Sequence, residues 1–149
     1  MQIQLLQNLR AAIFVVSITL QKRFAFNNYL FQNKITAFIG VFFLTIAFIF
    51  IVTSLYQFIR SKNSIITIRS ATSLQKTGIY QITRNPMYLA LFMVYLGLTC
   101  LLGNWWNLIL LPLLLVMIQK YVVKNEEKYL EREFGQEFID YKLKVRRWL

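Results

Sequence analysis

The feature that most constrains this chain is a run of 25 residues without a charged side chain, from Ile35 to Ile59. As an α-helix, such a run extends about 37 Å, and the hydrocarbon core of a bilayer is about 30 Å thick. The run is therefore long enough to span a membrane with some tilt. Composition agrees, because 57% of the 149 residues are hydrophobic and 15% are charged, which is too apolar for a soluble domain of this size.

Further apolar runs predict additional membrane helices. Residues Pro86–Leu102 and Trp105–Val123 are separated by Gly103 and Asn104, a break that predicts a tight helical hairpin. Pro112 predicts a kink or local irregularity in the second arm. The weaker run Ala11–Leu20 is interpreted as a first spanning helix, with a half-inserted helix as the alternative. We expect an all-α polytopic bundle of about four transmembrane helices.

The distribution of charge predicts the topology. Lys and Arg are concentrated in residues 60–84 and after Gln119, whereas the turn at Gly103 has none. Because cytoplasmic loops are enriched in basic residues, we expect loop 60–84 and both termini to be cytoplasmic. Lys22, Arg23 and Lys34 fall in a loop that this topology places outside, but the two larger clusters outweigh them.

The C-terminal tail has a different character. All six acidic residues lie between Glu126 and Asp140, and residues 121–143 are expected to form a charged helix with Gly135 as a weak point or break. Its apolar positions recur with helical spacing and define one face of an amphipathic helix: Leu130, Phe134, Phe138 and Tyr141.

Several classes of function are disfavoured by composition. The net charge of +11 could indicate nucleic acid, but the basic residues lie between apolar runs rather than along a soluble face, so we expect no nucleic-acid partner. With one cysteine and no histidine, a metal site is not expected. The usual general base near neutral pH is also missing, so any proton transfer must use Glu, Asp, Tyr or Lys.

A first candidate site lies where the chain enters the membrane after the basic loop. Asn85 is a good N-cap and Pro86 is favoured at the first helical position, so a helix should begin here. Its free backbone N–H groups, with the guanidinium of Arg84, would form a site for a carboxylate or phosphate. The plain alternative is a helix start with a topology-marking arginine.

A second candidate is the acidic pair Glu126–Glu127, which the hairpin would return to the same membrane face. Alone, the pair could belong to a solvated helix with Lys–Glu pairs at i, i+3. Together with the arginine and the helix start, it would form a pocket with both charge signs, suited to a zwitterionic ligand. Tyr80 and Tyr88 could add ring faces or hydroxyls.

The order and spacing of these motifs resemble a known family. The stretch GIYQITRNPMY, followed by NEEKYLEREFGQEFIDYKLKVRRWL, is similar to integral-membrane methyltransferases of the isoprenylcysteine carboxyl methyltransferase type and to phospholipid methyltransferases. The resemblance covers roughly residues 67–149. It implies membrane helices in residues 1–66 and a cofactor-binding region in residues 67–149, within a single integrated domain.

The resemblance also implies S-adenosylmethionine as cofactor and a lipophilic or lipidated substrate that enters from membrane lipid. It assigns cofactor binding to seven residues: Tyr80, Arg84, Asn85, Pro86, Tyr88, Glu126 and Glu127. Tyr141 and Arg147 would belong to a covering tail. The chain departs from the family at Asn85, where many relatives have His, and at Ala90, where many have Gly.

The residues expected to act on the reactants are Arg84, Glu127 and Arg147. Arg84 and the helix start would hold the cofactor carboxylate, and Glu126 or Glu127 its amino or ribose groups. Arg147 would hold an anionic acceptor. A carboxylate or thiolate acceptor needs no base, so the lack of histidine favours these over an amine. The alternatives are a non-enzymatic membrane assembly protein and a sterol-reductase-type nicotinamide enzyme.

Overall fold

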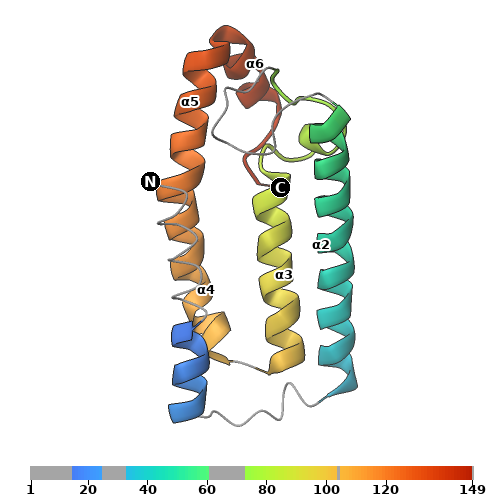
Figure 1. Cartoon of the computed structure of the whole chain (residues 1–149), viewed down its shortest axis with the longest axis vertical. Helices are drawn as coiled ribbons and strands as arrows, with labels where there is room; N and C mark the ends of the chain where they lie inside the picture. The colour runs from blue at the N-terminus through green and yellow to red at the C-terminus, as the bar shows by residue number, and fades with distance from the viewer. Residues whose placement is uncertain (1–14, 25–32, 61–72, 104, 149) are drawn as a thin grey trace. The chain divides into compact units, whose positions relative to one another are not determined.

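The computed structural model describes residues 15–24, 33–60, 73–103 and 105–148. Every regular element in these ranges is a helix (Figure 1), as expected for an all-α chain. Residues 15–23 are helical. They are followed by α2 (Lys34–Arg60), the 3₁₀ turn η1 (Gly78–Gln81), α3 (Pro86–Leu102), α4 (Trp105–Met117), the π-helical segment η2 (Ile118–Val123), α5 (Lys124–Phe134) and α6 (Gln136–Lys144).

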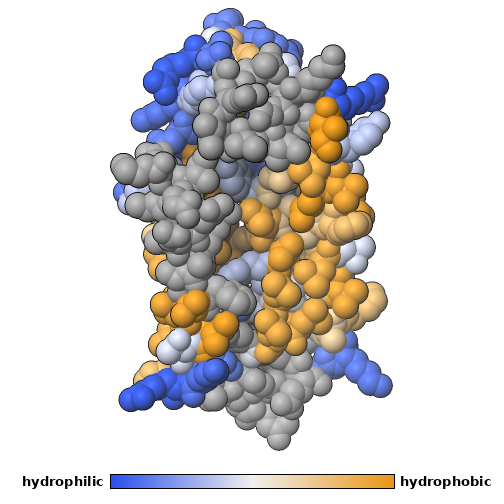
Figure 2. Space-filling view, in the orientation of Figure 1, coloured by the Kyte–Doolittle hydropathy of each residue, from blue (hydrophilic) through white to orange (hydrophobic). Residues whose placement is uncertain are grey.

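Two helical segments are long and apolar enough to cross a membrane, Lys34–Gln57 and Trp106–Phe134, whereas α3 is a shorter apolar helix. Large side chains on α2 point outward, among them Phe38 and Phe48, which are 74% and 67% exposed. Figure 2 shows this apolar surface over α2. Residues 1–14 lie outside the described part of the chain, as do residues 61–72 of the basic loop.

The chain packs as two compact units, one of residues 1–44 and 94–125, the other of residues 45–93 and 126–149. In the first unit, the backbones of α2 and α3 approach closely. A Cβ atom on Gly97 would lie 2.7 Å from Cγ of Leu44 and 2.9 Å from the carbonyl oxygen of Gly40. This approach resembles the close packing of small residues between membrane helices.

The predicted hairpin also lies in the first unit. α3 ends at Leu102 and α4 begins at Trp105, and Gly103 has a φ of 64° that favours glycine. The Tyr95 hydroxyl donates a hydrogen bond to Oδ1 of Asn107 across the two helices, at 3.3 Å. α4 continues through Pro112 to Met117, and the departure from α-helical geometry follows it, as η2.

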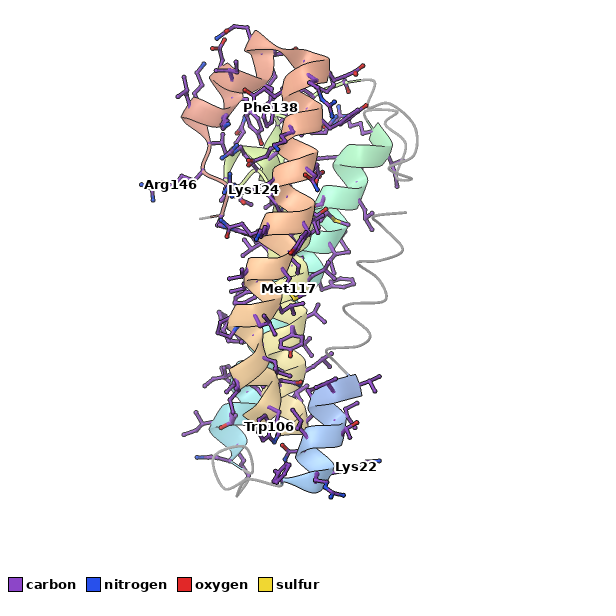
Figure 3. All side chains as sticks on the ribbon, turned by 90° about the vertical axis from the view of Figure 1, so that its left-hand side faces the viewer. Lys22, Trp106, Met117, Lys124, Phe138 and Arg146 are labelled. Carbon is purple, nitrogen blue, oxygen red and sulfur yellow. The ribbon has the colours of Figure 1, made fainter. Side chains whose placement is uncertain are left out.

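The second unit contains the tail helices. The tail is two helices rather than one, because Gly135 adopts a φ of 52° and separates α5 from α6. Phe138 and Tyr141 are buried on one face of α6, while Leu130 and Phe134 of α5 are half-buried. Figure 3 shows Phe138 among the clustered side chains beside α6 and Arg146 extended away from the ribbon.

Candidate active site

The predicted helix start is present in the second unit. α3 begins at Pro86, and Thr83, Asn85 and Pro86 are buried in front of or within its first turn. The backbone N–H of Asn85 donates to the hydroxyl of Thr83, at 3.3 Å. The residues that the sequence assigned to an anion site are therefore held in a rigid, desolvated turn.

The C-terminal segment is bonded directly to this turn. The backbone N–H of Arg84 donates to the carbonyl of Arg146, at 3.0 Å. The Thr83 hydroxyl and the side-chain amide of Asn85 both donate to the carbonyl of Arg147, each at 3.1 Å. Asn85 thus lies at the N-cap position, but its side-chain amide is hydrogen-bonded to the C-terminal segment. Thr83 was not among the predicted site residues. Its position directly before the Arg-Asn-Pro stretch could have indicated that it belongs to the site.

The centre of the site is a carboxylate between two guanidinium groups. Glu127 is 8% exposed. Its Oε1 lies 3.1 Å from Nη1 of Arg84, and Arg147 donates to it in a bidentate manner, with Nε–Oε1 at 2.9 Å and Nη2–Oε2 at 2.7 Å. Planar bidentate pairs of this kind are the strong, orienting form of ion pair.

Arg84 and Arg147 differ in how many of their guanidinium donors make hydrogen bonds. Burial lowers the pKa of Arg84, which Glu127 partly restores and the charge of Arg147 lowers again. Within the described part of the chain, Nε and Nη1 of Arg84 are buried and make no hydrogen bond, although Nη1 is ion-paired with Glu127. The pKa of Arg147 is instead raised, chiefly by its hydrogen bonds to Glu127. Arg84 therefore carries a donor, Nε, that a further anion could satisfy.

The adjacent acid serves a different partner. Glu126 accepts a hydrogen bond from the hydroxyl of Tyr88, at 3.0 Å between the tyrosine oxygen and Oε2. Tyr88 lies on the first turn of α3 and Glu126 on the first turn of α5. The predicted association of the acidic pair with the helix start is thus formed by two separate contacts, one from each glutamate.

Two buried tyrosines fasten α6 to the turn before α3. The hydroxyl of Tyr141 donates to the carbonyl of Tyr80, at 2.6 Å. Burial raises the pKa of Tyr141 to about 12 against a small opposing effect of Arg84. Burial also raises the pKa of Tyr80, with the carboxylate of Glu126 adding to it. Both phenols are therefore protonated at neutral pH, and that of Tyr141 acts as a hydrogen-bond donor.

All the predicted site residues lie in the second unit, and the contacts above join most of them. The pairing of Arg147 with Glu127 was not anticipated, because the sequence placed the arginine against a substrate. Glu127 is also not on the solvated face that i, i+3 lysine pairs would imply. The sequence identified Glu126, Glu127 and Arg147 as candidate site residues, but it did not show which side chains each of them would contact.

Comparison with known proteins assigns the chain to a class of methyltransferases. A profile of the family described as phospholipid methyltransferase matches residues 35–137, and the chain belongs to this family. This result confirms the resemblance on which the site assignments were based.

Individual relatives agree with the family. The chain is 42% identical over 66 residues to an uncharacterized protein of Haemophilus influenzae, covering 42% of this chain and all of that protein. It is 39% identical over 72 residues to the protein-S-isoprenylcysteine O-methyltransferase of Saccharomyces cerevisiae. The corresponding enzyme of Schizosaccharomyces pombe is 37% identical over 68 residues.

The matches to the yeast enzymes are partial. They cover 48% and 46% of this chain but 30% and 29% of the two enzymes. No solved structure matches the chain significantly. Similarity to the enzymes therefore identifies a shared region, which leaves substrate and partners to be inferred from the site.

Proposed function

We propose that the protein transfers a methyl group from S-adenosylmethionine to a lipophilic acceptor at the cytoplasmic surface of a membrane. The observation that carries this proposal is the buried guanidinium of Arg84 before the start of α3. Its Nη1 is ion-paired with Glu127, but its Nε makes no hydrogen bond in the described part of the chain. The chain belongs to a methyltransferase family, so methyl transfer is the reaction that such a binding site would serve.

The residues fit the polar part of this cofactor. S-adenosylmethionine has a carboxylate and an ammonium group on its amino-acid end. The free Nε donor of Arg84 and the N-terminus of α3 at Pro86 suit the carboxylate. Glu126 and Tyr88, with the amide of Asn85 nearby, suit the ammonium or ribose hydroxyls. Tyr80 would support this wall through its contact with Tyr141.

Glu127 has a second role in this proposal. Its carboxylate holds both Arg84 and Arg147, so it orients the guanidinium that would face the ligand. Binding the cofactor amino or ribose groups would use the same carboxylate. The bound cofactor would supply the electrophilic methyl group, and the chain would contribute orientation and exclusion of water.

The acceptor that fits best is a carboxylate or thiol on a lipid-like group. A carboxylate, or a thiol already ionised to the thiolate, is a nucleophile without a base, and this chain has no histidine. The yeast relatives are named for O-methylation of isoprenylcysteine, so a prenylcysteine-like carboxylate is the acceptor to test first. Arg147, positioned by Glu127, is the proposed partner for the acceptor anion.

The membrane arrangement belongs to the same proposal. Two segments have the length and composition to span a bilayer, and α3 and the first apolar segment would complete four transmembrane helices. Loop 60–84 and both termini would face the cytoplasm, because they carry the largest clusters of basic residues. The amphipathic tail helices would cover the cofactor from that side, and residues 67–149 would form the cofactor-binding region.

Binding of the cofactor can be tested in detergent-purified protein. Calorimetry with S-adenosylmethionine should show binding that Arg84→Ala weakens at least tenfold, since one charge-assisted contact contributes about 1.5–3 kcal/mol. Arg132→Ala is the matched control, because Arg132 is an exposed arginine on α5. Absence of binding by the folded wild-type protein would refute the proposal.

Transfer needs a separate measurement. Radiolabelled methyl groups should pass from S-adenosylmethionine to a small prenylcysteine acceptor and much less to its methyl ester, which has no free carboxylate. Parallel incubation with membrane phospholipids tests the amine alternative. Binding of cofactor together with labelling of phospholipid but not of prenylcysteine would retain the enzyme class and reject the carboxylate acceptor.

A further inference from the structure

The C-terminal end of the second unit carries an exposed surface that the proposed active site does not use. We define the tail patch as Lys142, Leu143, Lys144 and Arg146, all exposed. Leu143 has 81% of its surface exposed, although it lies in the last turn of α6 between two lysines. Leu143 thus places an aliphatic side chain among the cations on the outer face of the helix.

The opposite face of α6 is packed against the rest of the second unit. Phe138 and Tyr141 are buried at 1% and 6% exposure, and Tyr141 is hydrogen-bonded to Tyr80. The outward direction of Leu143 is therefore fixed by the packing of its own helix. Turning Leu143 inward would expose the two aromatic residues.

The contacts that the basic side chains of the tail patch make leave them largely exposed to bind an external anion. Lys142 lies 3.8 Å from Glu131, and both side chains are about half exposed, at 40% and 45%, so this pair is weak. The backbone carbonyl of Arg146 accepts from Arg84, but its side chain extends away from the ribbon (Figure 3). Asp140, an exposed acid of α6, accepts a hydrogen bond from Gln136 at 2.9 Å.

We infer that the tail patch docks on a bilayer surface rich in anionic lipid. Cations with an adjacent aliphatic side chain match a charged headgroup layer above hydrocarbon, where Lys and Arg bind phosphates and the apolar residue enters the boundary. The same chain carries two membrane-length helices, so it is tethered close to such a surface. Trp148, which is half-buried, adds a residue type that favours the interface.

The expected effect is electrostatic and additive. Each Lys or Arg near an anionic surface changes binding about fivefold, so three cations favour the docked state about a hundredfold. Salt should weaken docking, because the screening length falls from about 10 Å at 0.1 M to about 3 Å at 1 M. Docking does not depend on cofactor or methyl transfer.

The single cysteine of the chain permits a direct test. In a Cys100→Ser background, Leu143→Cys is labelled with a polarity-sensitive fluorophore, and the full-length protein is reconstituted in nanodiscs of phosphatidylcholine with or without phosphatidylglycerol. We expect a blue shift and quenching by nitroxide lipids only in the anionic discs, both reversed by 1 M salt. The matched control is Glu133→Cys, an exposed position on α5, which should not change.

The cations are tested by replacing Lys142, Lys144 and Arg146 with glutamine in the labelled protein. This variant should lose the response to anionic lipid while retaining the helical circular dichroism spectrum. Equal emission in both discs, an equal shift at position 133, or a response that persists without the cations would each overturn the inference. A shift of the same size with soluble polyglutamate would show a general anion surface rather than a lipid site.

Discussion

Replacing Arg147 with alanine tests the central ion pair of the second unit. The change removes two short hydrogen bonds to Glu127, at 2.9 and 2.7 Å, and leaves a carboxylate that is 8% exposed with Arg84 at 3.1 Å. Breaking a fully buried pair costs about 3–5 kcal/mol. Because Arg84 remains and the side chain of Arg147 is 27% exposed, we expect a loss of about 2–3 kcal/mol in the free energy of unfolding.

Thermal unfolding in a mild, uncharged detergent measures this loss. For a chain of this size it corresponds to a fall in Tm of roughly 4–12 °C. The matched control is Arg146→Ala, which removes a neighbouring exposed arginine and keeps the backbone carbonyl that Arg84 binds; it should change stability by no more than about 0.5 kcal/mol. A double-mutant cycle with Glu127→Gln should show coupling above about 1 kcal/mol. Equal melting of the two arginine variants would refute the reasoning.

Three further results are expected from the same preparations. Gly97→Ala should destabilise the protein by about 1–3 kcal/mol in detergent denaturation, because its Cβ would lie 2.9 Å from a backbone oxygen of α2; unchanged stability would contradict this close approach. Burial raises the folded-state pKa of Tyr141 to about 12, so its contribution to stability is full below about pH 10 and is lost as pH rises towards 12. Tyr141→Phe should flatten this alkaline loss in a pH series of melts, and a wild-type loss confined to lower pH would count against it. Asn85→Asp should be more destabilising than Asn85→Ala, because a carboxylate would face the carbonyl of Arg147; the reverse order in thermal melts would exclude the hydrogen bond.

The helix start of α3 was predictable from local sequence. Asn and Pro have strong positional preferences, and α3 does begin at Pro86. The hairpin was also predictable, because a Gly-Asn break between two apolar runs admits few other geometries, and Gly103 has the positive φ that such a turn uses. These features depend on residues within a few positions of one another.

The partners of the charged side chains were not predictable in the same way. Sequence placed Arg147 against an acceptor and Glu127 against the cofactor, whereas the structure joins the two residues to each other. That pairing depends on how α6 ends and on the carbonyls of residues 146 and 147 binding the turn at Thr83 and Asn85. No periodicity or motif encodes contacts that cross some sixty residues of chain.

The π-helical segment was equally inaccessible. Pro112 removes a backbone donor and predicts a disturbance near its own position, but α4 continues through Pro112 to Met117. The irregularity lies later, at residues 118–123, immediately before the first turn of α5 that carries Glu126 and Glu127. A π-helical segment changes the direction in which following side chains point, so the orientation of both acids depends on it.

The charge of the central cluster indicates what completes it. Arg84 and Arg147 share one carboxylate, that of Glu127, while the neighbouring Glu126 is bonded to Tyr88. Two guanidiniums with one carboxylate leave one positive charge in a largely desolvated place, and burial already lowers the pKa of Arg84. A single added anion at Nε of Arg84 would offset both the charge and the missing hydrogen bond. The carboxylate of the proposed cofactor is such an anion.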